Sequence, residues 1–157
     1  MFEKKYKLTN WKQFVFSDEH KFKLFSVVNQ HNDIMWTNNP NQVPPRETLK
    51  YTSTWMAWAA ITYEGKTKLV EVKNIINAKD YQVTLQKNLL NEINKMKVSS
   101  QWLHQQDGAP PHNVISTQKW LKSNASFIPK EDWSQNSLDL NPIESLWVIV
   151  NDRIEDR

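Results

Sequence analysis

One stretch decides how the rest of the chain is interpreted: Asn136-Ser137-Leu138-Asp139-Leu140-Asn141-Pro142-Ile143-Glu144-Ser145-Leu146-Trp147. It predicts a loop that ends abruptly where a helix starts, because Asn141 is a favourable N-cap and proline is well tolerated at the first helical position. Glu144 then falls in the first helical turn, close to the positive end of the helix dipole. Apolar residues at helical spacing predict a buried face on this helix: Ile143, Leu146, Trp147, Val150 and Ile154.

Two interpretations of Glu144 are open. The local pattern alone favours a capping box, in which the glutamate side chain bonds back to the N-cap amide. The second interpretation groups Glu144 with two other carboxylates that stand near the ends of strand-like runs. Asp18 follows Phe14-Val15-Phe16-Ser17, and Asp107 follows Trp102-Leu103-His104-Gln105-Gln106. If these elements meet at the edge of one sheet, the three carboxylates form a site.

Composition narrows the class of protein. A chain of 157 residues with 39% hydrophobic residues and eight tryptophans can bury a core, so we expect residues 1–157 to form a single domain. The absence of cysteine excludes disulfides and thiolate metal sites. No apolar run approaches the ~20 residues that a membrane helix needs, so no membrane partner is expected. The net charge of +3 is compatible with binding to nucleic acid and does not require it.

The pattern of the first fifty residues predicts strands and a loop. Two short β-rich runs, Gln13–Phe16 and Phe22–Val28, flank polar residues 17–20, so we expect a hairpin with a tight turn at residues 17–20. A third strand is expected over Asp33–Trp36. Residues 37–50 contain three prolines and no periodicity, which predicts a long loop.

The rest of the chain predicts alternating elements. In chain order they are a strand at Thr52–Tyr63, a turn at Glu64-Gly65, a strand at Thr67–Val72, a helix from the Asn77 cap to about Met96, a strand at Ser100–Gln106, a helix at about Asn113–Ser123, a short strand at Ser126–Ile128, and the helix that starts at Asn141. Hairpins followed by alternating helices and strands are typical of an α/β domain with a mixed sheet.

A group of three carboxylates favours one kind of chemistry. Its ligands are all oxygen, which selects hard cations such as Mg²⁺ or Mn²⁺ over zinc. Two such ions ~4 Å apart can activate an attacking oxygen and stabilise a leaving oxygen in a phosphoryl displacement. Since Gly65 and Gly108 are the only glycines, the chain has no nucleophile elbow, P-loop or dinucleotide fingerprint, and no small-molecule cofactor is expected. The four histidines lack metal-site spacing, and for His112 we expect a hydrogen-bonding or capping role.

Four blocks of the sequence closely resemble the catalytic blocks of Tc/mariner transposases and follow that family's order. They are Phe16-Ser17-Asp18-Glu19, Trp55-Met56-Ala57-Trp58-Ala59-Ala60-Ile61 with Gly65-Lys66, Gln106-Asp107-Gly108-Ala109-Pro110-Pro111-His112, and Ser137-Leu138-Asp139-Leu140-Asn141-Pro142-Ile143-Glu144-Ser145-Leu146-Trp147. The resemblance runs from about Trp11 to the C-terminus. A glutamate at position 144 is similar to the Tc-like members, whereas mariner-like members carry aspartate there.

The resemblance implies a fold and a function. The fold is ribonuclease-H-like, an α/β domain with a mixed five-stranded sheet flanked by helices. The function is that of a DNA transposase, which cuts and joins DNA at a DDE-type site with two Mg²⁺ or Mn²⁺ ions. By motif position, Asp18, Asp107 and Glu144 are the implied catalytic residues and metal ligands, whereas Asp139 is not. The implied partners are transposon-end and target DNA and a second copy in a homodimer of the full-length enzyme, and the implied location is the nucleus.

The chain departs from the family's pattern in three ways. The interval between Asp107 and Glu144 is slightly longer than is usual in Tc-like members, and Ala59 stands where glycine is common. No helix-turn-helix module is predicted before Trp11, so we expect a catalytic domain without the DNA-binding region that reads transposon ends. The alternative hypothesis is an inactive remnant that acts only as a DNA-binding or dimerisation module. By analogy, the loop at 37–50 lies where relatives insert a segment that reaches the partner subunit.

One substitution follows from this hypothesis. Asp107→Asn is expected to abolish nicking that depends on Mn²⁺ or Mg²⁺ and to leave the fold intact. Carboxylates that lie together without a metal repel one another. Because the substitution removes one of these charges, any change in the melting temperature is expected to be an increase.

Overall fold

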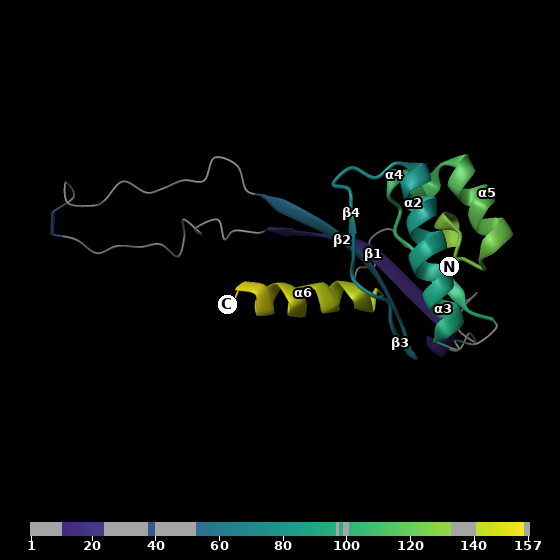
Figure 1. Cartoon of the computed structure of the whole chain (residues 1–157), viewed down its shortest axis with the longest axis horizontal. Coiled ribbons are helices and arrows are strands. Elements are labelled where there is room, and N and C mark those ends of the chain that lie inside the picture. Colours follow the sequence, from purple (N-terminus) through teal and green to yellow (C-terminus); the bar gives the residue numbers. More distant parts are fainter. Residues whose placement is uncertain are drawn as a thin grey trace.

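The computed structural model describes residues 11–23, 38–39, 53–96, 98, 101–132 and 141–155 (Figure 1). The strands are β1 (Phe14–Lys23), β2 (Thr54–Thr62), β3 (Gly65–Lys66), β4 (Val70–Val72) and β5 (Leu103–Gln105). The helical segments are η1 (Trp11–Gln13), α2 (Ala78–Thr84), η3 (Leu85–Leu90), α3 (Asn91–Lys95), α4 (Pro110–Asn113), α5 (Ile115–Asn124), η4 (Lys130–Asp132) and α6 (Pro142–Glu155).

The strands form one mixed sheet. Its order is β3-β2-β1-β5, and β4 also pairs with β2. β1 is antiparallel to β2 and parallel to β5. The parallel pair requires a long crossover, which the helical segments α2, η3 and α3 provide. The five-stranded mixed sheet with flanking helices confirms the predicted fold class.

The hairpin predicted around residues 17–20 is wrong. β1 runs unbroken through these residues and pairs with β2 from Val15 opposite Thr62 to Lys23 opposite Thr54. The polar residues stay extended because each finds a partner elsewhere in the fold: Ser17 Oγ lies 2.8 Å from His104 Nε2, Asp18 accepts a hydrogen bond from Trp147, and His20 contacts Asn151. Their turn propensity is therefore outweighed by tertiary contacts. Residues 24–28, the strand predicted at 33–36 and the loop predicted at 37–50 lie outside the described residues, except Asn38 and Asn39.

The second predicted hairpin is confirmed. β2 turns at Tyr63 and Glu64 into β3, and β4 continues along the same neighbour. Thr62 Oγ1 stabilises the turn by accepting hydrogen bonds from the amides of Glu64 and Gly65, at 3.0 and 3.1 Å. Gly65 has a positive φ of 156°, which favours glycine at this position.

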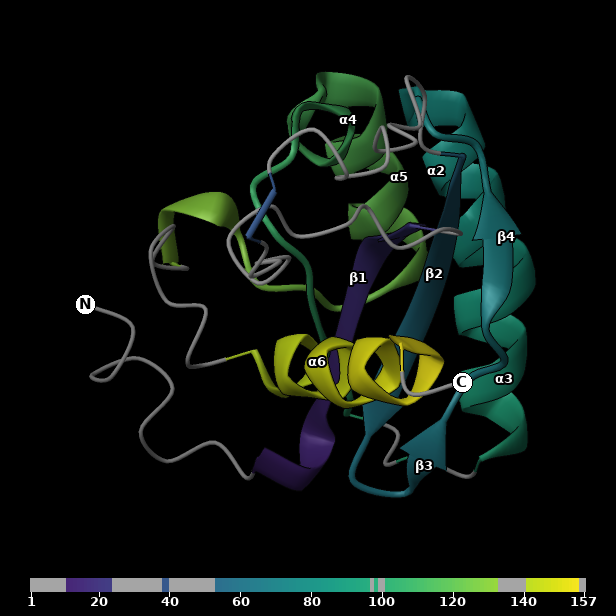
Figure 2. The same cartoon turned by 90° about the vertical axis from the view of Figure 1, so that its left-hand side faces the viewer.

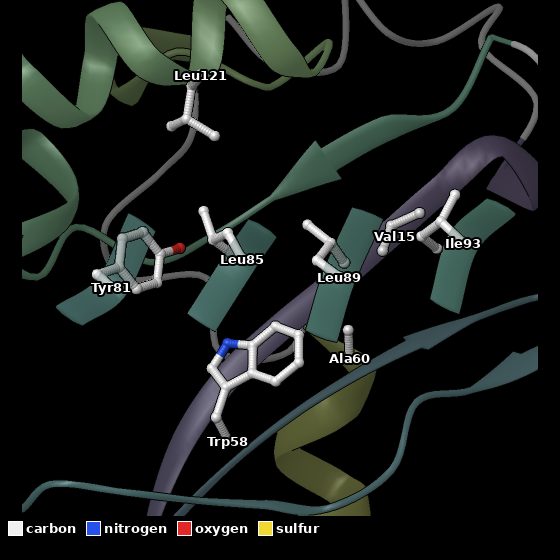
Figure 3. Close-up of a cluster of buried hydrophobic side chains, with 8 residues drawn as sticks. All are labelled: Val15, Trp58, Ala60, Tyr81, Leu85, Leu89, Ile93 and Leu121. Atoms are coloured by element: carbon white, nitrogen blue, oxygen red, sulfur yellow. The ribbon is translucent and has the colours of Figure 1, made fainter. Parts of the chain in front are cut away.

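The long predicted helix is also confirmed, as three continuous segments. Asn77 caps it, because its side-chain oxygen accepts a hydrogen bond from the amide of Asp80 at 2.9 Å. The middle segment η3 is a π-helical stretch. Figure 3 shows the stripe that faces the sheet, made by Tyr81, Leu85, Leu89 and Ile93. These side chains pack on Val15, Trp58 and Ala60 of the sheet and form the main core with Leu121 of α5.

α6 covers the opposite face of the sheet (Figures 1 and 2). Its residues Ile143 and Trp147 are buried against Phe22, Ala57 and Ala59. Because side chains alternate along a strand, neighbouring residues of β1 and β2 belong to different cores. Val15 packs under the long helix, whereas Phe22 packs under α6. This alternation determines which polar residues of β1 can reach which helix.

The remaining predicted elements are present but shorter or divided. The strand predicted at 100–106 is β5, and the helix predicted at 113–123 is α4 followed by α5. The strand predicted at 126–128 makes one isolated bridge, between Phe127 and His104. Among the described residues, no helix combines the length and the apolar character needed to span a membrane.

Candidate active site

Asp18 lies in the middle of β1, on the face that α6 covers. Only 8% of this residue is exposed. Trp147 of α6 donates a hydrogen bond from Nε1 to Asp18 Oδ2 at 2.9 Å, although the two residues are far apart in the sequence. The Trp147 ring is held in turn by stacking on His20, with 5.3 Å between ring centroids. One oxygen of Asp18 is therefore fixed by the helix.

Glu144 lies in the first turn of α6, as predicted. Asn141 caps this helix: its side-chain oxygen accepts from the amide of Ile143 at 3.4 Å, and its carbonyl accepts from the amide of Glu144 at 3.1 Å. Among the described residues, the Glu144 carboxylate makes no hydrogen bond back to the Asn141 amide, so the capping-box interpretation is not supported. The side chain of Glu144 is left for another role.

Asp107 lies beyond β5, and Asp18 lies beyond the part of β1 that pairs with β5. The last parallel pair is Phe16 with Gln105, and each aspartate lies two residues beyond it. The two aspartates therefore lie just beyond the same end of the parallel pairing between β1 and β5, although β1 itself continues to Lys23. Asp107 Oδ1 accepts a hydrogen bond from the amide of Ala109 at 3.0 Å and lies 2.6 Å from Nδ1 of His112.

The charges of these carboxylates act on one another. Burial, followed by the nearby charges of Glu144 and Glu19, raises the pKa of Asp18 to about 7, and Asp107 adds a smaller effect. Of the two other proposed ligands, Glu144 raises the pKa of Asp18 more than Asp107 does. A buried carboxylate among like charges favours a nearby cation, because the cation would offset both burial and repulsion.

His112 contacts Asp107 and lies near Glu19. Sequence analysis did not place either His112 or Glu19 beside Asp107. The His112 side chain is 4% exposed, and its two ring nitrogens face two carboxylates: Nδ1 faces Asp107, and Nε2 lies 3.6 Å from Oε1 of Glu19. Burial alone would lower the pKa of His112, but the two carboxylates raise it to about 9. Partial burial alone would raise the pKa of Asp107, but the contact with His112 outweighs it and the pKa is lowered.

The sequence contains only weak indications that Glu19 and His112 lie beside Asp107. Glu19 belongs to the same block as Asp18, but alternation along β1 turns it to the opposite face, toward Tyr81 and His112. Sequence spacing gives no hint that a residue five positions after Asp107 folds back onto it. The hydrogen-bonding or capping role predicted for His112 stays a prediction, and the structure shows its Nδ1 2.6 Å from Asp107 Oδ1.

His104 and His20 have partners other than the proposed ligands. His104 is fully buried, its Nε2 contacts Ser17, and burial lowers its pKa to about 3. His20 contacts Asn151 at 2.9 Å. His31 lies outside the described residues.

The donor set fits a hard cation. Asp18, Glu144 and Asp107 offer only carboxylate oxygens, and Asp18 in particular gains from a nearby positive charge. Within the residues that the structure describes, no three His, Asp or Glu side chains are gathered closely enough to hold an ion as they stand. Two of the carboxylates already have contacts within the protein. One oxygen of Asp18 accepts a hydrogen bond from the Trp147 ring, and one oxygen of Asp107 lies beside a ring nitrogen of His112. Their assignment as metal ligands stays a prediction.

The fold is that of known transposase structures. The chain is similar to the Mos1 transposase paired-end complex with left transposon end, with a TM-score of 0.73 and 16% identity over 98% of this chain and 45% of that one. It is similar to the Mos1 mariner paired-end complex with Mn, with a TM-score of 0.71 and 18% identity over the same shares. The catalytic domain of Mos1 mariner transposase matches 99% of this chain with a TM-score of 0.67 and 16% identity, over 67% of its own length. The chain thus has the ribonuclease-H-like fold of these structures.

Sequence comparison finds relatives among transposases. No family model matches the chain. It is 33% identical over 142 residues to the Tc3 transposase of Caenorhabditis elegans, covering 90% of this chain and 42% of that protein. It is 28% identical over 144 residues to the Tcb2 transposase of Caenorhabditis briggsae, covering 88% and 50%. The relatives of the chain are thus transposases of the Tc/mariner family, and the chain spans about half the length of the curated relatives it matches.

Proposed function

We propose that this domain carries the DNA cleavage and strand-transfer activity of a Tc/mariner transposase. The observation that supports the proposal is the register of β1 and β5, in which Asp18 and Asp107 each lie two residues beyond the last parallel pair, together with the effect of Glu144, in the first turn of α6, on the pKa of Asp18. The sequence similarity to the Tc3 transposase supports it. This arrangement suits phosphoryl transfer, in which the protein mainly positions reactants and neutralises charge.

The proposed cofactor is a pair of Mg²⁺ or Mn²⁺ ions held by Asp18, Asp107 and Glu144. When bound, such ions activate the attacking oxygen and stabilise the leaving one. The protein's own residues do the positioning: Trp147 holds Asp18, and the Asn141 cap fixes the turn that carries Glu144. That Mos1 complexes have been solved with Mn supports a divalent ion here.

The proposed partners are DNA and a second copy of the full-length protein. The Mos1 paired-end complex contains the left transposon end, which supports transposon-end DNA as the substrate of this family member. Target DNA would be the acceptor in strand transfer. A homodimer would bring two ends together, and chromosomal substrates imply that the protein acts in the nucleus.

Nicking of supercoiled plasmid by the 157-residue chain tests the proposal. The wild type should nick DNA with Mn²⁺ and should not with EDTA. Asp18→Asn and Glu144→Gln should reduce nicking to background, since each removes a proposed ligand. Glu131→Gln, at an exposed position of η4, is the matched control and should keep full activity. Metal-independent nicking, or equal loss in Glu131→Gln, would contradict the proposal, and an inactive wild type would favour the remnant hypothesis.

A further inference from the structure

The backbone around Asp107 does little to hold its side chain in one position. β5 ends at Gln105, and the residues between it and α4 have no regular structure. The Asp107 side chain is 49% exposed, and the backbone offers it one hydrogen bond, from the amide of Ala109. A surface carboxylate in such a segment samples several rotamers, whereas a metal ligand has to be held close to one geometry.

His112 provides a rigid support. Its ring stacks on the fully buried ring of Tyr81, with 3.9 Å between centroids and 26° between planes. The Tyr81 hydroxyl donates a hydrogen bond to Gln106 Oε1 at 2.6 Å, and Gln118 Nε2 donates to the His112 carbonyl at 2.7 Å. Tyr81 of α2 thus contacts both the imidazole of His112 and the side chain of Gln106, the residue before Asp107.

Glu19 completes the support from the other side. Its side chain is 8% exposed and its Oε1 is buried, with no hydrogen bond in the part of the chain that the structure describes. A buried carboxylate without a partner is costly, so the nearby imidazole is the group that makes this position tolerable. Because both ring nitrogens of His112 face carboxylates, the ring has no free lone pair with which to bind a metal itself.

Resting on the proposed function, we propose that His112 is a positioning residue: fixed by Tyr81 and Glu19, it holds Oδ1 of Asp107 so that Oδ2 is presented to the metal site. Nδ1 of His112 lies 2.6 Å from Oδ1 of Asp107, so the buried ring limits the positions that this oxygen can take. Groups that orient a ligating carboxylate in this way usually change metal affinity by about 10- to 100-fold when replaced.

Two substitutions separate the two contacts of the ring. In His112→Asn the amide nitrogen can occupy the place of Nδ1 and keep the contact to Asp107. In His112→Gln the amide nitrogen reaches toward the place of Nε2, so it keeps the contact to Glu19 and loses the one to Asp107. Both variants are neutral, polar and smaller than histidine, and each is the control for the other.

The measurement is Mn²⁺ affinity by electron paramagnetic resonance of the free ion, together with nicking as a function of Mn²⁺. His112→Gln should bind Mn²⁺ about tenfold more weakly or worse, and His112→Asn should stay closer to the wild type. At saturating Mn²⁺, His112→Gln should regain most of its nicking rate, because Asp107 is still present. Asp107→Asn should not regain it at any concentration.

The outcomes distinguish this inference from the proposed function. A folded His112→Gln variant with wild-type Mn²⁺ affinity would overturn the positioning role and leave the function standing. A wild-type protein that neither binds Mn²⁺ nor nicks DNA would overturn both. If His112→Gln does not fold, Glu19→Gln provides the second test, because it loosens the ring without touching Asp107. Unchanged Mn²⁺ affinity in Glu19→Gln would then overturn the arrangement.

Discussion

Asp18 and Asp107 have the same proposed role but opposite environments. Asp18 is buried among like charges, and its pKa is raised to about 7. Asp107 is half exposed and paired with His112, and its pKa is lowered. Without a metal, the charged form of Asp18 therefore opposes folding, whereas the charged form of Asp107 supports it. The two aspartates should respond in opposite directions to the same substitution.

Asp18→Asn should stabilise the metal-free protein at pH 8. The folded pKa of about 7 lies above the unfolded value of 3.8, so the cost of the charge appears as pH rises between these values and is complete above them. A shift of this size corresponds to at most about 4 kcal/mol. Asparagine keeps an oxygen that can accept the hydrogen bond from Trp147. Thermal unfolding in EDTA checks this: the variant should melt higher than the wild type at pH 8, and the gap should close near pH 4. A lower melting temperature at pH 8 would mean that the charge is compensated.

Asp107→Asn should destabilise the metal-free protein, which reverses the expectation drawn from the sequence. On sequence alone the three carboxylates form one repelling group, but the structure pairs Asp107 with the buried His112. Because the folded pKa is lowered, the stabilisation is present above the unfolded value of 3.8 and is lost as pH falls through the folded pKa. Thermal unfolding at pH 7 should show a lower melting temperature than the wild type. An increase would show that repulsion by Asp18 and Glu144 outweighs the pair.

α6 is the element that joins the core to the site. Ile143 and Trp147 anchor it on the sheet, and the same Trp147 holds Asp18. The pattern of apolar residues predicted this helix and its start at Asn141 correctly. It did not reveal that the indole of Trp147 donates to Asp18, because that contact joins residues far apart in the sequence.

Trp147→Phe should uncouple these two roles. The phenyl ring keeps apolar contact with Phe22, whereas the hydrogen bond to Asp18 is lost. Leaving a buried carboxylate short of a donor costs about 1–3 kcal/mol, so chemical denaturation at pH 8 should show a loss of this size. In the background of Asp18→Asn the loss should be smaller, which a double-mutant cycle measures. Trp120→Phe, in α5 on the other side of the sheet, is the control and should give the same loss in both backgrounds.

Elements with strong periodicity were predictable, and contacts across the fold were not. The stripe Tyr81, Leu85, Leu89 and Ile93 identified the long helix because every fourth residue meets the same sheet face. The turn predicted at residues 17–20 failed because Ser17, Asp18 and His20 are held extended by partners on other elements. Motif spacing located the three proposed ligands, but Glu19 was missed because its role depends on which face of β1 it occupies.

The domain as a whole should lose stability between about pH 6.5 and pH 9 when no metal is bound. Charging Asp18 becomes costly as pH approaches about 7. His112, whose folded pKa of about 9 lies above the unfolded 6.5, contributes stability that is complete below 6.5 and is lost as pH rises through 9. Asp18 and His112 therefore both favour the lower pH, whereas buried His104, whose pKa is lowered to about 3, opposes them below its unfolded value of 6.5.

Mn²⁺ should offset the part of this pH dependence of stability that comes from Asp18. An ion bound by charged carboxylates stabilises the folded state in proportion to its occupancy. At pH 5 Asp18 is largely protonated, so excess Mn²⁺ should shift the melting temperature little, whereas at pH 8 the shift should be clear. Thermal unfolding with EDTA and with Mn²⁺ at both pH values measures this, and Asp18→Asn is the control that should lose the shift at pH 8. A melting temperature in EDTA that does not fall between pH 7 and 9 would contradict the contribution of His112, and an equal Mn²⁺ shift in Asp18→Asn would show that Asp18 does not bind the metal.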